Sequence, residues 1–401
     1  MMILVNIFSA VERTDPSPAG HGESHSQFID RVAGPYWDQV RNLVEEWFSR
    51  LCSDAQADVR GRLRSRDDRQ SKGAFFELYL HECLFRMGYA VTCHPQVDGT
   101  SRRPDFLAEK DGSAVYVEAR SASSSDIAVG AAARVNTLYE SLDKVDSPDF
   151  YLWIDVDRQG GGPLRARPLR SALEEWLKDL DPDAYEDRGN GRRDFPGLPY
   201  EANGWRIQFH ALPKSPKARG KKGVRPLAIL SGGQAFGGHD QEGIKNALSD
   251  KGSAYGPLDA PYVVAVASSS MSTDDHDVKN ALYGTEALQV ATGSGGETRP
   301  AALVRSPDGY WYKGDHWAHR HVSAVLVVKQ LHPAFVGTQQ HTIWEHPDPE
   351  RCVPQLPMWR RSTVNAHGTM HFVDPARTPT EWFGLKDPWP IEEPFPRKDR
   401  S

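Results

Sequence analysis

The sequence predicts a mixed α/β fold, in which helices pack against a mixed sheet of parallel and antiparallel strands. Three observations carry this prediction. Apolar residues recur every three or four positions over residues 28–63 and 71–87, which is the spacing of helices with one buried face. Two apolar runs flank a polar turn within residues 103–120, which indicates an antiparallel hairpin. The run 150–156 is a further strand, and helices that alternate with strands in this way are typical of α/β domains.

The length of 401 residues allows two ordinary domains or one heavily elaborated domain, and an apolar fraction of 39% is enough for a real core. We divide the chain into three parts. Residues 1–68 are predicted to form an N-terminal strand, a mobile loop and helices, and residues 69–200 a core domain. Residues 201–401 are predicted to form a C-terminal α/β extension, whose strands can continue the core sheet.

Net charge and the placement of basic residues bear on nucleic-acid binding. A net charge of −6 argues weakly against a protein that coats nucleic acid nonspecifically. Enzymes commonly carry their basic residues in patches instead. One patch contains Arg62, Arg64 and Arg66, and another fills the loop from Lys214 to Arg225. Each is either a phosphate-binding surface or an ordinary solvated face, and the pattern leaves both open.

The cysteines and the N-terminal segment bear on the compartment. The four cysteines, Cys52, Cys83, Cys93 and Cys352, show no paired metal-binding spacing. We expect them to be reduced and mostly structural, which suits a cytoplasmic protein. Residues 1–10 are apolar, but they lack a basic flank and are too short for a signal peptide or a membrane span. We therefore expect a strand there and no membrane partner.

The helix predicted over Ser71–Met87 is the first element of the core. Phe76, Leu80 and Leu84 recur at helical spacing along it, and Gly88 ends it. Glu77 and His81 lie four residues apart at the edge of this apolar stripe. They are either an ordinary polar helix edge or part of a site. Residues 89–94 follow as a plausible first strand.

The hairpin that follows brings two acidic residues together. If Glu109 pairs with Ala114 across the Lys-Asp-Gly-Ser turn, Asp105 stands directly opposite Glu118. Residues opposite each other on antiparallel strands have Cβ atoms about 5 Å apart. Carboxylates at that distance repel unless a cation or a proton lies between them, so the pair is a natural site for Mg²⁺ or Mn²⁺.

Taken together, Pro104-Asp105 and Glu118-Ala119-Arg120 resemble the motif of the PD-(D/E)XK nuclease superfamily, with Arg120 where the family usually has lysine. The resemblance implies a restriction-endonuclease-like αβββαβ core. A helix over 127–144 and the strand 150–156 would complete that core. It also implies Mg²⁺ or Mn²⁺ held by Asp105 and Glu118, with Glu77 as a supporting acid, and a catalytic set of these three residues and Arg120.

Beyond the core, the same patterns predict a series of further elements. Helices are expected over 168–180, 240–250 and 277–283, and strands over 205–212, 226–230, 262–267, 322–329 and 341–344. The Gly-rich run 231–238 lacks the Gly-Lys-Ser/Thr ending of a P-loop and the spacing of a dinucleotide fingerprint, so we do not expect nucleotide binding there.

The resemblance makes a metal-dependent DNA endonuclease the leading function, with defence against foreign DNA as the role the family implies. Arg62, Arg64, Arg66 and Arg134 are the residues we expect to contact DNA, and Arg134 is an alternative source of the missing lysine charge. Two other functions stay open: a nuclease-fold module that binds nucleic acid or protein without cutting, and a small-molecule enzyme built on the C-terminal half. A homodimer also stays open.

Overall fold

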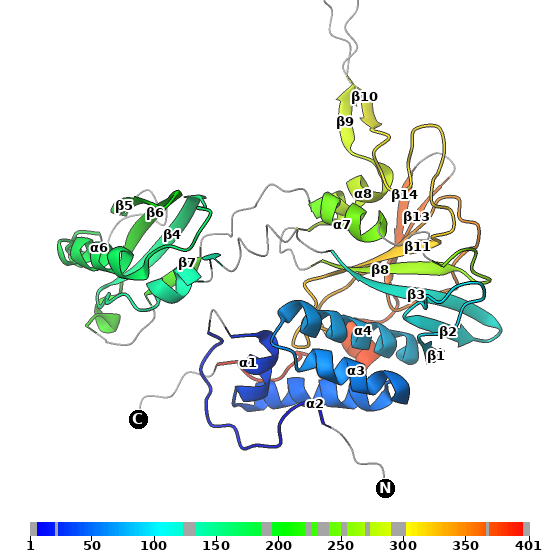
Figure 1. The fold of residues 1–401 in the computed structure, drawn as a ribbon, viewed down its shortest axis with the longest axis horizontal. Helices are drawn as coiled ribbons and strands as arrows, with labels where there is room; N and C mark the ends of the chain where they lie inside the picture. The colour runs from blue at the N-terminus through cyan, green and yellow to red at the C-terminus, as the bar shows by residue number, and fades with distance from the viewer. Residues whose placement is uncertain are drawn as a thin grey trace, which may run out of the picture. The chain divides into compact units, whose positions relative to one another are not determined.

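The structure is a computed structural model that confirms a mixed α/β fold (Figure 1). It describes residues 6–20, 23–122, 134–135, 137–185, 195–220, 226–230, 240–249, 255–268, 273–289, 302–365 and 369–395. The Gly-rich run 231–238 and residues 127–133 and 136 of the helix expected over 127–144 lie outside the described residues.

The chain forms two compact units. The first comprises Met1–Pro18, Ser24–Ser123 and His239–Ser401, and the second comprises Ala19–Glu23 and Ser124–Gly238. The second unit is therefore inserted into the first. The units divide the chain differently from the three predicted parts, and strands from before and after the insertion pair in one sheet, so residues beyond 201 do continue the core sheet.

Eight strands form the sheet of the first unit, in the order β1-β2-β3-β8-β11-β12-β13-β14. Their bounds are β1 (Ala90–Cys93), β2 (Phe106–Lys110), β3 (Ser113–Ser121), β8 (Tyr262–Ser268), β11 (Ala324–Lys329), β12 (Thr342–Glu345), β13 (Arg360–Val364) and β14 (Met370–Val373). The central strands β3, β8 and β11 are parallel to one another, while β1, β2 and β3 form antiparallel pairs. The expected strands at 262–267, 322–329 and 341–344 are thus confirmed as parts of one sheet.

Helices cover both faces of this sheet. On one face, Val117 and Val263 pack into a core shared with α2 (Pro35–Arg50), α3 (Ser53–Leu63) and α4 (Asp68–Arg86). On the other face, Tyr116 and Val264 pack with α7 (Asp240–Ser249) and α8 (Asp275–Tyr283). Neighbouring strand residues enter opposite cores because successive side chains of a strand point to opposite faces.

The hairpin of β2 and β3 has the predicted register. Glu109 pairs with Ala114, and Phe106 pairs with Val117. Asp111 and Gly112 have φ angles of 48° and 76°, and two successive positive φ values are what a tight two-residue hairpin turn requires. The turn therefore sets the pairing that brings the start of β2 to the end of β3.

In the first unit, the helix and the three strands predicted for the core are followed by a helix and a strand other than those predicted. They are α7 and β8, and β8 runs parallel to β3. Strand β4 (Phe150–Arg158) belongs to the second unit instead, because it pairs antiparallel with β6 (Trp205–Pro213). The expectation that residues 150–156 complete the core of the first unit is wrong.

The second unit has its own sheet and core. The strand order is β5-β6-β4-β7, with β5 at Gly197–Ala202 and β7 at Leu227–Leu230. Helix α6 (Ala166–Lys178) contributes Leu169, Leu173 and Leu177 to a core that also contains buried Trp205. Residues 134–135 and 137–142 are helical as well.

Smaller elements complete the first unit. Helix α1 (His25–Arg31) precedes α2, the strands β9 (Glu286–Gln289) and β10 (Ala302–Arg305) form a separate ribbon, and α9 (Pro379–Phe383) lies near the C-terminus. Among the described helices, none has the length and apolar character needed to cross a membrane.

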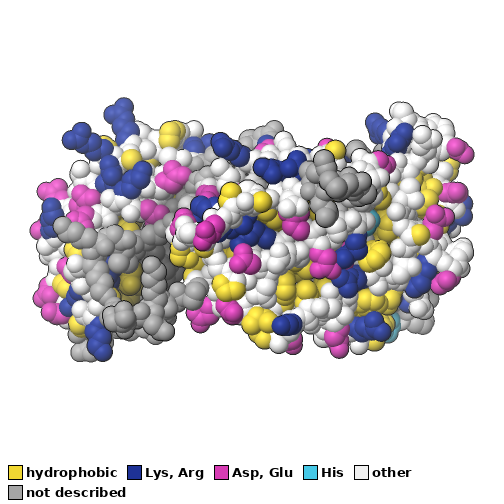
Figure 2. Space-filling model, turned by 90° about the horizontal axis from the view of Figure 1, so that it is seen from below, with side chains coloured by type: hydrophobic (Ala, Val, Ile, Leu, Met, Phe, Trp, Pro, Cys, Tyr) yellow, Lys and Arg dark blue, Asp and Glu magenta, His cyan; other side chains and the backbone are white. Residues whose placement is uncertain are grey.

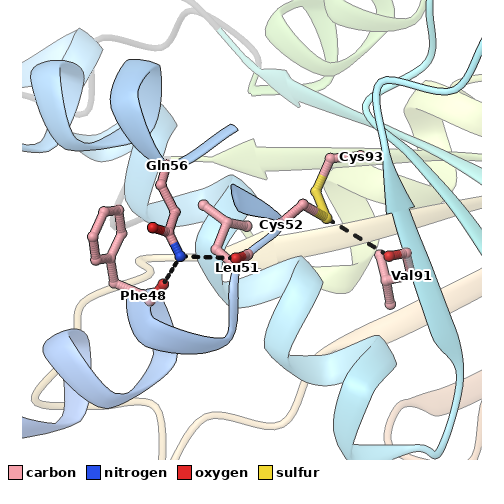
Figure 3. Close-up of a disulfide and its surroundings, with 6 residues drawn as sticks. All are labelled: Phe48, Leu51, Cys52, Gln56, Val91 and Cys93. Atoms are coloured by element: carbon pink, nitrogen blue, oxygen red, sulfur yellow. Dashed lines mark hydrogen bonds between the residues drawn. A yellow bond between two sulfur atoms is a disulfide. The ribbon is translucent and has the colours of Figure 1, made fainter. Parts of the chain in front are cut away.

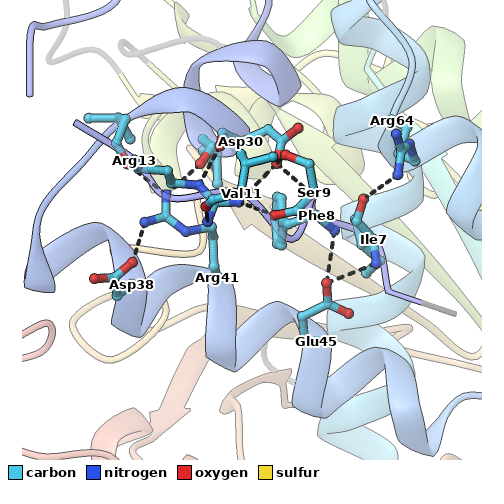
Figure 4. Close-up of polar contacts among 12 residues, drawn as sticks. Ile7, Phe8, Ser9, Val11, Arg13, Asp30, Asp38, Arg41, Glu45 and Arg64 are labelled. Atoms are coloured by element: carbon cyan, nitrogen blue, oxygen red, sulfur yellow. Dashed lines mark hydrogen bonds and ion pairs between the residues drawn. The ribbon is translucent and has the colours of Figure 1, made fainter. Parts of the chain in front are cut away.

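Two expectations about the N-terminal region are wrong. The described residues 6–10 do not form a strand, because the backbone N–H groups of Ile7 and Phe8 donate to the Glu45 carboxylate instead of to a neighbouring strand (Figure 4). The four cysteines are also not all reduced, since Cys52 and Cys93 form a disulfide. Cys83 and Cys352 are free, as expected.

Candidate functional site

Asp105 and Glu118 lie together at the end of the hairpin. Asp105 directly precedes β2, and one further step of the ladder places it opposite Glu118 of β3. The backbone N–H of Ala119 donates to Oδ2 of Asp105 at 2.7 Å, which holds this carboxylate against β3. The predicted convergence of the two acids is therefore present, and the Glu118 side chain is buried.

Glu77 of α4 belongs to the same group of acids. Burial, together with the negative charges of Glu118 and Glu77, raises the pKa of Asp105 to about 8. A carboxylate that raises the pKa of a neighbouring acid in this way is close enough to interact with it electrostatically. Glu77 is thus near enough to Asp105 for their charges to interact, and we call Glu77, Asp105 and Glu118 the acid cluster.

Arg120 lies on the same face of β3 as Glu118. Its Nη2 donates to Oε1 of Glu118 at 2.6 Å, as expected from the alternation of side chains along a strand. The Nε of Arg120 is buried and has no hydrogen-bond partner within the described part of the chain. Burying an N–H group without an acceptor costs free energy of folding. Nε of Arg120 is therefore available to donate a hydrogen bond to an oxygen atom that enters the site.

Two tyrosines complete the site, and sequence reasoning missed both. The Tyr255 hydroxyl donates to Oε2 of Glu118 at 2.6 Å. The ring of Tyr262 lies 5.9 Å from that of Tyr255, and burial together with the charge of Glu118 raises its pKa. No local pattern marks Tyr255, because its hydrogen bond to Glu118 joins residues that lie 137 positions apart in the sequence.

Arg62 has a different role from the predicted one. It donates to both oxygens of Glu77, at 2.8 and 2.5 Å, and also to Asp58. These bonds raise the pKa of the guanidinium and occupy it within the protein. The structure therefore places Arg62 beside the acid cluster, where its charge offsets that of Glu77.

The other predicted DNA contacts are divided between the two units. Arg64 is exposed and donates to the carbonyl of Ile7 (Figure 4), and Arg66 is exposed at the end of the same segment. Arg134 belongs to the second unit and is described with that unit alone. On the face drawn in Figure 2, Lys and Arg side chains are interspersed with Asp and Glu.

The donors of the acid cluster suit a hard divalent cation. Mg²⁺ and Mn²⁺ prefer carboxylate oxygens, and the cluster offers three carboxylates from α4, the start of β2 and β3. Oδ1 of Asp105 accepts no hydrogen bond from the described residues, whereas both oxygens of Glu77 and of Glu118 do. Burial comes first among the causes that raise the pKa of Asp105, and a cation would offset the second cause, the negative charges of Glu118 and Glu77.

No family model matches the chain, and neither a curated protein nor a solved structure matches it.

Proposed function

We propose that this protein is a metal-dependent nuclease that hydrolyses phosphodiester bonds of DNA. The observation that carries the proposal is the convergence of Glu77, Asp105 and Glu118 beside the guanidinium of Arg120. Carboxylates of this kind hold a cation, and the adjacent guanidinium can bind an anionic substrate.

The topology supports the same proposal. The chain order α4, β1, β2, β3, α7, β8 is the αβββαβ order that the PD-(D/E)XK resemblance implies, with the second unit inserted between β3 and α7. Glu77 lies on α4, Asp105 directly before β2 and Glu118 on β3, and the resemblance implies acids at such positions. Arg120 stands where the usual lysine would be.

Asp105, Glu118 and Glu77 would hold Mg²⁺ or Mn²⁺, which when bound lowers the pKa of a water molecule and offsets charge on the phosphate. Tyr255 orients the Glu118 carboxylate through its hydroxyl. The Ala119 N–H does the same for Asp105. Arg120 stays protonated, so it acts as a donor to a phosphate oxygen rather than as a base.

A second candidate is a nuclease-fold module that binds nucleic acid without cutting it. It is favoured by the pairing of Arg62 with Glu77 and of Arg120 with Glu118, since these guanidinium groups neutralise two of the three acids without a metal. DNA cleavage distinguishes the nuclease from the binding module, because only the nuclease cuts DNA. A cytoplasmic location and a role in defence against foreign DNA are parts of the leading proposal.

The test is cleavage of circular, linear and single-stranded DNA by purified protein in Mg²⁺, Mn²⁺ or EDTA. We expect cleavage with either metal and none in EDTA, and we expect Asp105→Asn and Glu118→Gln each to abolish it, because a lost carboxylate charge weakens a hard cation's site. DNA binding without cleavage in every condition would favour the binding module.

A further inference from the structure

The first unit contains a second group of potential metal ligands, and one of them, His81, lies one helical turn from Glu77 on α4. Cys52, Cys93 and His81 each place one ligand atom within 4.8 Å of those of the other two. Cys52 lies at the start of α3, Cys93 ends β1, and His81 lies on α4. We call these three residues the thiol–imidazole cluster.

The state of His81 points to a ligand. Its side chain is only 3% exposed, and Nδ1 is buried with no hydrogen-bond partner in the described part of the chain. Leaving a buried polar atom unpaired is energetically costly. Burial also lowers the pKa of this histidine to about 4, so the ring is neutral at pH 7, the form that coordinates metals.

The cysteines can supply the other two ligands when their disulfide is reduced. Sγ of Cys52 lies 3.6 Å from the carbonyl oxygen of Val91, where a thiol would have an acceptor (Figure 3). The backbone directly before Cys52 is held by a hydrogen bond, because Nε2 of Gln56 donates to the Leu51 carbonyl at 3.0 Å. The Cα atoms of the two cysteines are 6.2 Å apart. Two sulfurs on one tetrahedral zinc lie about 3.8 Å apart, since each Zn–S bond is about 2.3 Å.

We propose that Cys52, Cys93 and His81 form a site for a thiolate-preferring divalent cation, with zinc as the natural occupant, in the reduced protein. Two thiolates and one imidazole are ligands that zinc favours, and they leave its fourth position to water. The disulfide is the oxidised, metal-free form of the same site. The hard oxygen ligands of the acid cluster select a different class of metal.

The chemistry of the interconversion balances. Two molecules of a small thiol reduce the disulfide to two cysteine thiols and leave as one small-molecule disulfide. Binding of Zn²⁺ then displaces the two thiol protons to solvent, while the neutral imidazole coordinates without losing a proton. A reducing compartment therefore favours the metal-bound form, and an oxidising one favours the disulfide.

An ion bound by the thiol–imidazole cluster would have a structural role. His81 lies one turn beyond Glu77 on α4, and Cys93 pairs with Phe106, next to Asp105. The backbone N–H of His94 donates to the carbonyl of Asp105 at 2.9 Å. An ion that ties α4 to the end of β1 therefore holds the elements that bring Glu77 and Asp105 together.

The test uses Co²⁺ as a spectroscopic substitute for zinc. The full-length protein is reduced with a phosphine, desalted without oxygen, and titrated with Co²⁺ in excess Mg²⁺, which occupies the carboxylate site. We expect one equivalent to bind with a thiolate-to-cobalt charge-transfer band, and zinc to displace it. The protein that keeps its disulfide should show no such band.

Variants assign the ligands. Cys52→Ser and His81→Gln should each weaken zinc binding by more than about 100-fold, since loss of an outer-sphere partner alone costs about 10–100-fold. Cys352→Ser is the matched control, because Cys352 is free and exposed. Equal band intensity in reduced wild type and Cys52→Ser would overturn the proposal.

A measurement on wild type covers the case in which the variants do not fold. Zinc should protect Cys52 and Cys93 of the reduced protein from alkylation, as read by mass spectrometry, while exposed Cys352 reacts at the same rate with or without zinc. Equal labelling of Cys52 and Cys93 in both conditions would overturn the site. Neither experiment depends on DNA cleavage, so the nuclease proposal stands or fails separately.

Discussion

Arg62 donates one hydrogen bond to each oxygen of Glu77, at 2.8 and 2.5 Å, across the contact between α3 and α4. This two-point geometry is the strongest form of arginine–carboxylate pairing. It also places a fixed positive charge beside the acid cluster. The metal-free protein depends on that charge, because burial and two neighbouring carboxylates already disfavour ionised Asp105.

Replacing Arg62 should therefore destabilise the protein most when no divalent cation is present. We expect Arg62→Ala to cost about 1–3 kcal/mol in EDTA, because Glu77 loses both of its donors. Saturating Mg²⁺ should recover part of this loss by supplying positive charge. Thermal unfolding in EDTA and in Mg²⁺ measures both values. Arg64→Ala is the control, since exposed Arg64 donates only to the Ile7 carbonyl and should show no dependence on Mg²⁺.

The raised pKa of Asp105 predicts a pH dependence of stability. The folded protein favours protonated Asp105 up to about pH 8, whereas the unfolded chain ionises it near its ordinary value of 3.8. The contribution of Asp105 to stability is thus fully present below pH 3.8 and is lost as the pH rises through about 8. In EDTA, Asp105→Asn should be the more stable protein at pH 9, by on the order of 1–3 kcal/mol.

Thermal unfolding of both proteins between pH 5 and pH 9 checks this expectation. The advantage of Asp105→Asn should shrink toward pH 5 and disappear when Mg²⁺ binds wild type. An advantage that is the same at pH 5 and pH 9 would mean that ionisation of Asp105 is not its source.

The two tyrosines of the site provide a matched pair of substitutions. Tyr255→Phe removes the donor to Glu118, and we expect Mg²⁺ or Mn²⁺ affinity to fall by about 10–100-fold, as for other groups that orient a metal ligand. Tyr262→Phe removes a buried hydroxyl that has no partner within the described residues, so affinity should not change. Calorimetric titration with Mn²⁺ compares them. Equal losses in both variants would assign the effect to packing rather than to Glu118.

Arg120 tests the departure from the family motif. If its guanidinium binds the scissile phosphate, Arg120→Ala should lower turnover by about 10²–10³-fold, in line with removal of one transition-state donor. Arg120→Lys should keep part of the activity, because the charge remains while the two-point geometry is lost. Single-turnover cleavage measures this. If Arg120→Ala kept full activity and Arg134→Ala lost it, the positive charge that replaces the family's lysine would come from Arg134 and not from Arg120.

Arg66 tests the remaining part of the predicted basic patch. It is exposed, and unlike Arg62 it has no role in the acid cluster. If it contacts a phosphate, Arg66→Ala should reduce the slope of log affinity against log salt by about 0.9. Fluorescence anisotropy with duplex DNA at several salt concentrations gives the slope. An unchanged slope would make Arg66 part of an ordinary solvated surface.

Local patterns predicted the hairpin and α4 correctly, because turn residues and apolar spacing act over a few positions. The register of Glu109 with Ala114 follows from the turn, and it places Asp105 opposite Glu118 without further information. The helical position of Glu77 followed equally from spacing. The spacing of apolar residues cannot show which other strand a given strand pairs with.

The fourth core strand illustrates this limit. Residues 150–156 and 262–267 are both short apolar runs, and periodicity is the same whichever sheet a strand joins. The nearer run was therefore assigned to the core, although β8 is the one that pairs with β3. Tyr255 was missed for the same reason. The bond between Cys52 and Cys93 also escaped prediction, because connectivity cannot be deduced from cysteine positions alone.

The insertion of the second unit has a consequence for synthesis on the ribosome. At about 5–20 residues per second, the roughly 140 residues between β3 and β8 take on the order of 10–30 s to translate. During that interval β3 is paired with β2 but lacks its parallel partner, and its free edge can bind another strand. The second unit has its own core, so it can fold in the meantime. Tyr255 can donate its hydrogen bond to Glu118 only after the segment that follows this folded insert has been synthesised.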